Sequence, residues 1–561
     1  MPRVSSDTYD FIIAGAGSAG CTLAARLAED PAVSVCLVES GGSGRSPFVT
    51  MPAGNGFIFG NPKFDWGFKS VPQPGLDGRR IYYPRGKGLG GSSLLNGMIY
   101  IRGNARDFDH WRQLGLQGWS YADVLPYFKR AEGAAHRHDQ YHGQEGPLSV
   151  SPAANFEAMS QRFIDAAQQA GARLNMDFNG ASQAGVGRLD STVHRGRRRS
   201  ASAAYLSKRP TNLAVLTHTH VLGISLKNGR AAGLSVADDR GTRTLNARRE
   251  IVSCLGAFGS PQLLMLSGIG PAEHLLDIGI EPLVDRAGVG ESLYDHPNMP
   301  VNFHLRDASS SLARFQRIDR AAGLALRYLF TQGGPGSGSF WSTTLFHSLR
   351  DPDMPELEVY FTPMIMKEEA AGAGFSIQNL LNLGRAVIAR GKVAVPGVEF
   401  DINLLRPRSR GRVRLATADP RQSLLIDPAY FTEPADLSDF VAGVRHIREV
   451  AAQPPLRDAL GPELSPGAAC QTDAQITAAI RAEATTGHHP VSTCRMGRDN
   501  DPGAVLDNCF RVYGVEGLRV VDASAFPNQI SGNPNAAIIM MAERAADMMM
   551  GRAPLPPEDT V

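Results

Sequence analysis

The sequence predicts an α/β protein with a dinucleotide-binding unit near its N-terminus, and three observations support this prediction. Residues 11–14 form a short apolar run typical of a buried strand, and a glycine-rich turn follows it. Cys21 to Ala28 has the periodicity of a helix, and a second apolar run, VSVCLVE, ends at Glu39. Strand, glycine turn, helix and acidic strand end, in this order, are typical of the βαβ unit of Rossmann-like folds.

The glycine turn has the pattern GxGxxG. One glycine makes the turn, one lets the backbone approach a pyrophosphate, and one lets helix and strand pack closely, while the helix N-terminus presents free N–H groups to the phosphates. The cofactor-binding residues predicted here are Gly15, Gly17, Ser18, Ala19 and Gly20. Glu39 would meet an unphosphorylated ribose, which favours FAD or NAD over NADP. A chance glycine turn is the alternative reading.

Composition and charge narrow the class of protein. A chain of 561 residues predicts two domains or one large elaborated domain, and 60 glycines indicate many tight turns. The net charge of +2 gives no reason to expect nucleic acid as a partner, and the basic run 195–200 is read as solvated or structural. The scattered cysteines, the lack of a signal peptide pattern and the lack of an apolar run of about 18 residues favour a reduced, cytoplasmic protein without a transmembrane segment.

Two further stretches combine small residues with element boundaries. Residues 85–104, RGKGLGGSSLLNGMIYIRGN, can bring many backbone N–H groups and short side chains against one flat ligand, although a flexible surface loop is the alternative. Residues 256–270, GAFGSPQLLMLSGIG, follow a strand-like run and open a helix. The second stretch therefore predicts another close-packed strand-to-helix junction.

Together these stretches resemble the two signatures of the glucose–methanol–choline (GMC) family of FAD-dependent oxidoreductases. The resemblance covers almost the whole chain, because further stretches match in order: DFDHW (107–111), HGQEGPL (142–148), RRSASAAYL (198–206), GVGESLYDHP (288–297), LLRPRSRGRVRL (404–415) and GLRVVDASAFP (517–527). The resemblance implies that the cofactor is FAD.

The resemblance also implies which other residues meet the FAD. These are Arg85, Gly90, Gly91, Ser92, Asn96, Gly97, Met98 and Ile99 in the second glycine loop, Val221 near the adenine, and Asp522, Ala523, Asn533 and Pro534 in the C-terminal segment. Some relatives attach FAD covalently through a histidine just before the loop asparagine. Here that position is Leu95, so the sequence predicts non-covalent FAD.

The stretch HPVSTCRM (489–496) resembles the part of the family pattern that carries the catalytic histidine. The resemblance implies that His489 takes the hydroxyl proton of an alcohol while hydride passes to the flavin, and that Asn533, at the head of the last helix, orients the substrate oxygen. Histidine suits the role of base because its ordinary pKa is about 6.5. The alternatives are a metal site, for which no further ligands are evident, and Cys494 as a nucleophile; no metal is predicted. His488 is read as structural or as part of the substrate pocket.

The expected domains are residues 7–300 for FAD, with insertions near 45–80 and 150–190, residues 301–515 for substrate, and residues 516–555 as a return to the discontinuous FAD domain. The substrate domain should be a mostly antiparallel sheet flanked by helices, with strands at 358–365 and 400–407.

The substrate and the electron acceptor stay open at this level. A primary alcohol is the broad expectation, reoxidised by O2 or a quinone-type acceptor, and no cage for a quaternary amine can be assigned. Phe340 and Trp341 would line the substrate pocket or pack in the core, and 374–391 would be a lid, a buried helix or a membrane contact. A hydroxynitrile lyase or a fatty-acid photodecarboxylase on the same fold is the alternative function. The sequence does not predict the oligomeric state.

Overall fold

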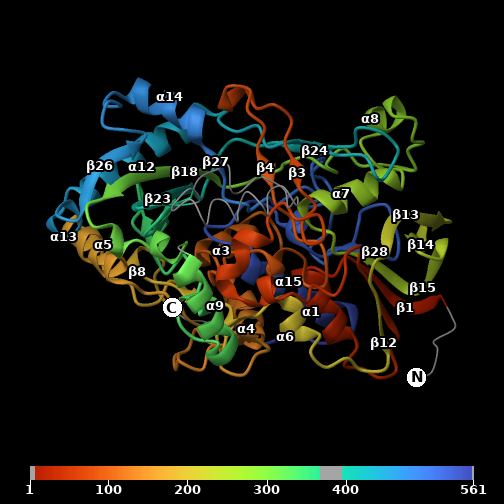
Figure 1. Ribbon diagram of the computed structural model, residues 1–561. Helices are drawn as coiled ribbons and strands as arrows, with labels where there is room; N and C mark the ends of the chain where they lie inside the picture. Colours follow the sequence, from red (N-terminus) through yellow and green to blue (C-terminus); the bar gives the residue numbers. More distant parts are fainter. Residues whose placement is uncertain (1–6, 317, 367–393, 559–561) are drawn as a thin grey trace.

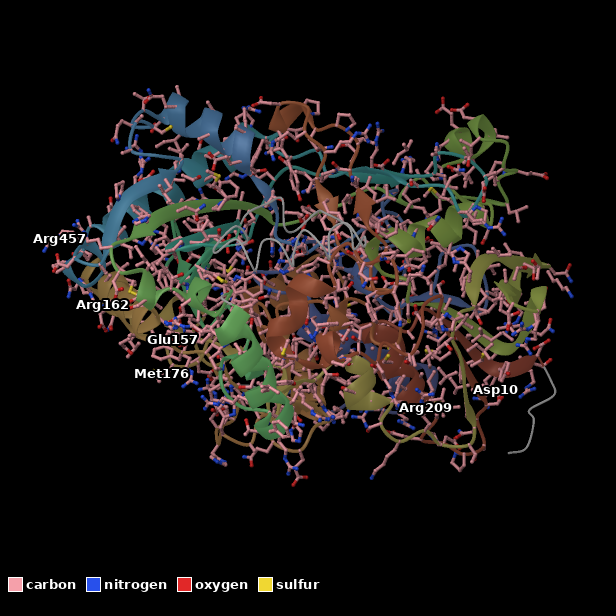
Figure 2. The ribbon with its side chains drawn as sticks, viewed as in Figure 1. Asp10, Glu157, Arg162, Met176, Arg209 and Arg457 are labelled. Atoms are coloured by element: carbon pink, nitrogen blue, oxygen red, sulfur yellow. The ribbon has the colours of Figure 1, made fainter. Side chains whose placement is uncertain are left out.

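A computed structural model describes residues 7–316, 318–366 and 394–558. Two seven-stranded sheets form the framework, and Figure 1 shows them on opposite sides of the molecule. Helices α1 (Ser18–Leu27) and α15 (Asn535–Met549) pack against each other near the middle of the view (Figure 1). Charged side chains of both signs lie at the periphery, such as Asp10 and Arg209 near the first sheet and Glu157 and Arg457 near the second (Figure 2).

The first sheet contains the predicted nucleotide-binding unit. Its strand order is β12-β2-β1-β15-β14-β13, and β28 pairs with β15. Strands β12, β2, β1, β15 and β28 pair in parallel, whereas β13 and β14 are antiparallel. The strands are β1 (Thr8–Ala14), β2 (Val35–Val38), β12 (Leu213–Leu216), β13 (His220–Lys227), β14 (Arg230–Asp238), β15 (Gly241–Ser253) and β28 (Leu518–Val520). Every residue of β2 is buried, which explains its continuous apolar run. The predicted strand–helix–strand unit is confirmed, with α1 at Ser18–Leu27.

The second sheet is antiparallel, as expected from the sequence. Its order is β26-β18-β23-β20-β19-β8, and β27 pairs with β18. The strands are β8 (Gly185–Arg188), β18 (Pro297–Leu305), β19 (Thr343–His347), β20 (Leu357–Thr362), β23 (Gly397–Leu404), β26 (Leu460–Ser465) and β27 (Thr485–Thr486). Strands β20 and β23 are the two strands predicted in this region. The stretch 374–391 lies outside the described residues.

Helices cover both sheets. Beside the second sheet lie α5 (Ala158–Gln169), α12 (Pro434–Ala451), α13 (Pro454–Arg457) and α14 (Asp473–Glu483). The others include α3 (Ala105–Gln113), α4 (Tyr121–Ala131), α6 (Ala201–Tyr205), α7 (Gly256–Leu266), α8 (Ala272–Asp277), α9 (Ile318–Thr331) and α15 (Asn535–Met549). Within the described parts of the chain, no helix is both long and apolar enough to cross a membrane.

Three helices begin where parallel strands of the first sheet end. β1 leads into α1, β15 leads into α7, and the segment after β28 leads into α15. Ligands of open α/β sheets bind at the carboxyl ends of the strands, where helix N-termini present unpaired N–H groups. This edge of the first sheet therefore forms one end of the site described below.

Candidate active site

A cavity of about 1800 Å³ connects the carboxyl edge of the first sheet to one face of the second sheet. At the first end its wall is formed by the glycine turn after β1, the second glycine loop and the start of α7. At the other end, residues of β18, β20 and β23 line it together with the 485–490 segment. A volume of this size is large enough for a cofactor and a small substrate together.

Glu39 organises the first end of the cavity. Its carboxylate accepts hydrogen bonds from the backbone N–H groups of Ala16 (3.0 Å), Gly41 (2.8 Å) and Gly88 (2.9 Å). Burial raises the pKa of Glu39, although these hydrogen bonds oppose the shift. Because Ala16 belongs to the first glycine turn and Gly88 to the second loop, Glu39 ties the two loops together beside the cavity.

The predicted cofactor residues gather at this cavity with two exceptions. The residues that line it are Gly15, Gly17, Ser18, Ala19, Glu39, Arg85, Gly91, Ser92, Asn96, Gly97, Met98, Ile99, Val221, Asp522, Ala523, Asn533 and Pro534. Gly20 and Gly90 are not among the lining residues. A Cβ atom on Gly20 would lie 1.9 Å from the carbonyl oxygen of Gly15, so this glycine permits close packing of α1 against the turn.

The backbone at this end fits a flat, phosphate-bearing ligand. A Cβ atom on Gly91 would lie 2.6 Å from Cα of Gly17, so the two glycine loops are in direct contact. Gly256 has φ +79°, and a Cβ atom there would meet no other atom within 4 Å. Nearby, the Asp522 carboxylate accepts hydrogen bonds from the N–H of Gly256 (2.8 Å) and the hydroxyl of Ser260 (2.5 Å), which fixes the start of α7. The turn, the close approach and the open space are what a dinucleotide cradle requires.

His489 and Asn533 meet at the junction between the two ends. The distance from His489 Nε2 to Asn533 Nδ2 is 3.0 Å. On the other side of the ring, His489 Nδ1 lies 2.9 Å from Nδ1 of His296, whose Nε2 lies 3.0 Å from the carbonyl oxygen of Ile530. The Tyr360 hydroxyl donates to Asn533 Oδ1 at 3.1 Å. The two residues predicted to be catalytic are therefore members of a longer hydrogen-bonded series.

Asp295 holds the backbone around the two histidines. Its buried carboxylate accepts hydrogen bonds from the N–H groups of His489 (2.7 Å) and His296 (2.9 Å), and from the hydroxyls of Thr486 (2.5 Å) and Tyr430 (2.5 Å). Burial raises the pKa of Asp295, and these hydrogen bonds oppose the shift. The positions of both imidazole rings are thus fixed through one carboxylate.

Burial keeps the two imidazoles neutral. It lowers the pKa of His489 well below the ordinary value, and interactions with His296, His488 and Arg85 lower it further. Burial also lowers the pKa of His296 to about 3, although hydrogen bonds to the carbonyls of Ile530 and Leu405 oppose this. A neutral imidazole beside an open cavity can accept a proton, which is the property a general base needs.

The second-sheet end of the cavity carries acidic and aromatic side chains. Asp401 and Glu399 alternate with buried residues along β23 and share its cavity face, and Tyr360 of β20 lies directly opposite Asp401 in the sheet register. Burial raises the pKa of Asp401 to about 6, opposed by hydrogen bonds involving Trp341, Glu399 and Asn298. Sequence patterns did not predict these wall residues, because the register of β20 and β23 is what brings them together.

The cavity is also lined by Phe340, Trp341 and His488, but not by Cys494. Phe340 and Trp341 both line the cavity and both pack against apolar clusters. Each side chain therefore contributes to the cavity wall and to the packed interior. His488 lines the cavity, and its carbonyl accepts a hydrogen bond from Arg85 (2.8 Å). Cys494 is buried behind the cavity wall, and burial raises the pKa of its thiol well above the usual value, which argues against a nucleophilic role.

The histidine-rich stretch near residue 140 forms an ion-pair network. His142 lies between Glu132 (3.1 Å) and Asp177 (2.9 Å), and Glu132 also pairs with Arg102. Although burial alone lowers the pKa of His142, hydrogen bonds to Asp177 and Glu132 raise it overall to about 9. His142 is thus held between two carboxylates and pairs with both.

A nucleotide cradle, a neutral histidine and an asparagine on one cavity fit a cofactor-dependent oxidoreductase. Comparison with known proteins agrees with this class. The family models for the N-terminal and C-terminal parts of GMC oxidoreductases match residues 9–298 and 407–542. The chain belongs to the GMC oxidoreductase family.

Relatives and solved structures match over nearly the full length. An oxygen-dependent choline dehydrogenase of Sinorhizobium fredii is 39% identical over 557 residues, which cover 97% of this chain and 96% of the relative. The crystal structure of pyridoxine 4-oxidase from Mesorbium loti has a TM-score of 0.85 at 29% identity, covering 97% of this chain and 100% of that chain. A formate oxidase variant from Aspergillus oryzae RIB40, studied for its FAD modification, has a TM-score of 0.87 at 26% identity and covers 98% of each chain.

Proposed function

We propose that the protein binds FAD without a covalent bond and oxidises an alcohol to the carbonyl compound. The observation that carries this proposal is the placement of His489 and Asn533, 3.0 Å apart, at the mouth of the nucleotide cradle. The formate oxidase relative was studied for its FAD modification, and the two glycine loops with Glu39 offer the contacts that the ADP half of FAD requires. Leu95 lines the cavity where a histidine would be needed for covalent attachment, and its side chain cannot form such a bond.

FAD, when bound, supplies the acceptor for the hydride that leaves the alcohol carbon. The protein supplies the rest of the chemistry. His489 accepts the hydroxyl proton, and its low pKa keeps it unprotonated over the physiological range. Asn533 donates a hydrogen bond to the substrate oxygen and holds the carbon in a fixed position. The N-terminus of α15, which begins two residues later, adds the positive end of a helix dipole to this region.

We further propose that the preferred alcohol carries a positive charge. Asp401 and Glu399 place carboxylates in the cavity wall, which Tyr360 and Trp341 also line. Asp401 lines the cavity, and burial raises the pKa of its carboxyl to about 6. A carboxylate in a cavity wall attracts a positive group, and aromatic faces also attract ammonium groups. The name of the choline dehydrogenase relative agrees with this substrate class.

The first experiment is anaerobic mixing of the purified, FAD-loaded protein with a panel of alcohols in the dark. The expected result is bleaching of the flavin absorbance by at least one alcohol. The rate of recovery after oxygen or a quinone is added then identifies the acceptor. A flavin that dithionite reduces but that no alcohol bleaches would contradict alcohol oxidation.

The charge preference is tested with two substrates of equal shape. Choline is compared with its neutral carbon analogue, in which a tert-butyl group replaces the trimethylammonium group, and with amino alcohols of similar size. The expected result is a higher kcat/KM for the cationic members. Equal or better turnover of the neutral analogue would overturn the charge preference while leaving alcohol oxidation in place.

A further inference from the structure

One series of hydrogen bonds crosses the site from a backbone carbonyl to a tyrosine hydroxyl. Its members, in order, are Ile530, His296, His489, Asn533 and Tyr360. The four distances lie between 2.9 and 3.1 Å. The rings of His296 and His489 meet at 85° with centroids 5.0 Å apart, so their contact is an edge-on hydrogen bond rather than stacking.

The carbonyl of Ile530 gives this series a direction. A carbonyl oxygen only accepts, so the hydrogen between it and His296 belongs to His296 Nε2. Because His296 is neutral, its Nδ1 then has a lone pair and accepts. The hydrogen between the two rings must therefore belong to His489 Nδ1. In a neutral His489 this leaves the lone pair on Nε2, the atom that faces Asn533.

The hydrogen bonds at the Asn533 and Tyr360 end of the series can run in the same direction. A lone pair on His489 Nε2 requires a donor, which is the Nδ2 amide group of Asn533. The Oδ1 atom of Asn533 is then turned towards Tyr360, whose hydroxyl donates to it. With His489 Nε2 unprotonated, a rotated amide would place Oδ1 of Asn533 against its lone pair. The tautomer of His489 and the orientation of the Asn533 amide are thus coupled.

We propose that His296 and Tyr360 are positioning residues that fix His489 in the Nδ1-protonated tautomer, with Nε2 as the proton acceptor. This inference rests on the proposed function, because it assigns the atom through which His489 acts. When Nε2 takes a proton, Nδ1–H remains bonded to a neutral imidazole and not to a carboxylate. The cation that forms is therefore stabilised less than the imidazolium of a serine-protease triad, whose partner is a carboxylate.

The variants His296→Phe and His296→Gln test the role of His296. Phenylalanine fills the space but cannot accept from His489. Glutamine can donate to Ile530 and accept from His489, so it can restore the series. We expect His296→Phe to lower the rate constant of flavin reduction about tenfold to hundredfold, the scale of a misplaced base, with little change in substrate Kd. His296→Gln should recover a large part of the loss.

His347→Phe is the matched control. His347 belongs to β19, stacks on His446 and does not line the cavity. It should keep the wild-type rate. If His296→Phe also reduces flavin at the wild-type rate, or if His296→Gln is as slow as His296→Phe, the inference is overturned.

A readout independent of turnover separates this inference from the proposed function. In FAD-loaded protein labelled with [15N]histidine, long-range 1H–15N correlation spectra report which ring nitrogen carries hydrogen, and the His489→Gln spectrum assigns the signals. We expect His489 with protonated Nδ1 and unprotonated Nε2, and loss of this pattern in His296→Phe. A protonated Nε2 in the wild type would overturn the inference even if alcohols bleach the flavin. The expected pattern without any bleaching would overturn only the proposed function.

Tyr360→Phe tests the far end of the series. Removal of the hydroxyl leaves Asn533 Oδ1 without its donor, so the amide can rotate and present oxygen to His489 Nε2. We expect a severalfold slower flavin reduction and a partial shift of His489 to the Nε2-protonated tautomer in the same spectra. An unchanged rate together with an unchanged spectrum would remove Tyr360 from the assignment.

Discussion

The two ends of the cavity are built in different ways. The end at the first sheet, which is the proposed cofactor end, is made mainly of backbone. Glycines close together in sequence set its turns, and Glu39 fixes them through three N–H groups. The end at the second sheet, which is the proposed substrate end, is made of side chains such as Tyr360 and Asp401. These two residues lie on neighbouring strands and are brought opposite each other by the register of the sheet. The cofactor end therefore tolerates few substitutions for steric reasons, whereas the substrate end can change chemically without altering the backbone.

The largest effect is expected where the two ends meet. His489→Ala should lower the rate constant of flavin reduction by ~10²-fold or more, because a positioned base contributes on this scale, while FAD remains bound. Stopped-flow reduction by the best alcohol, with the flavin absorbance of the purified variant, provides the measurement. His488→Ala, one residue away, should have a smaller effect, and the reverse order would exchange the roles of the two histidines.

The cofactor end is tested by adding a single methyl group. Gly20→Ala would place Cβ 1.9 Å from a backbone oxygen that cannot move aside, so we expect about 2–3 kcal/mol lower free energy of unfolding and loss of FAD. Denaturant unfolding and flavin content measure both effects. Gly323→Ala in α9 is the control: it meets no atom within 4 Å and should be neutral or slightly stabilising. Normal FAD content in Gly20→Ala would contradict the steric account.

The smallest effect is expected at the substrate wall. Asp401→Asn should raise the Kd of a cationic alcohol about tenfold, since a charge-assisted contact is lost, and leave folding and FAD content unchanged. Binding titrations with a cationic and a neutral alcohol provide the comparison, and an equal change for both would contradict a charge effect.

The pKa of Asp401, about 6, adds a pH signature to that experiment. The carboxylate is charged above this pH and protonated below it, so the affinity of the wild type for a cationic alcohol should fall as the pH drops through about 6. The Asp401→Asn variant should lack this dependence. An identical pH profile in both proteins would assign the titration to another group.

Local patterns predicted the parts of the site that are local in sequence. The glycine turn, the second glycine loop and the HP stretch with His489 were recognised because each is a short motif with fixed spacing. His296 lies in the stretch 288–297, but nothing in the sequence shows that its ring contacts His489. Tyr360 and Asp401 escaped because their meeting depends on the register of β20 and β23, which alternation alone does not specify.

The segment that carries His489 is joined to both sheets. β27 pairs with β18 of the second sheet just before it, and just after it the N–H of Ser492 bonds to the carbonyl of Ala523, which follows β28 of the first sheet. These anchoring bonds do not involve Asp401 of β23, whereas Tyr360 of β20 is bonded to Asn533 in the series that contains His489. Substrate range and reactivity are thus separable at Asp401, whose redesign towards other alcohols can leave the proton-accepting machinery intact, but not at Tyr360.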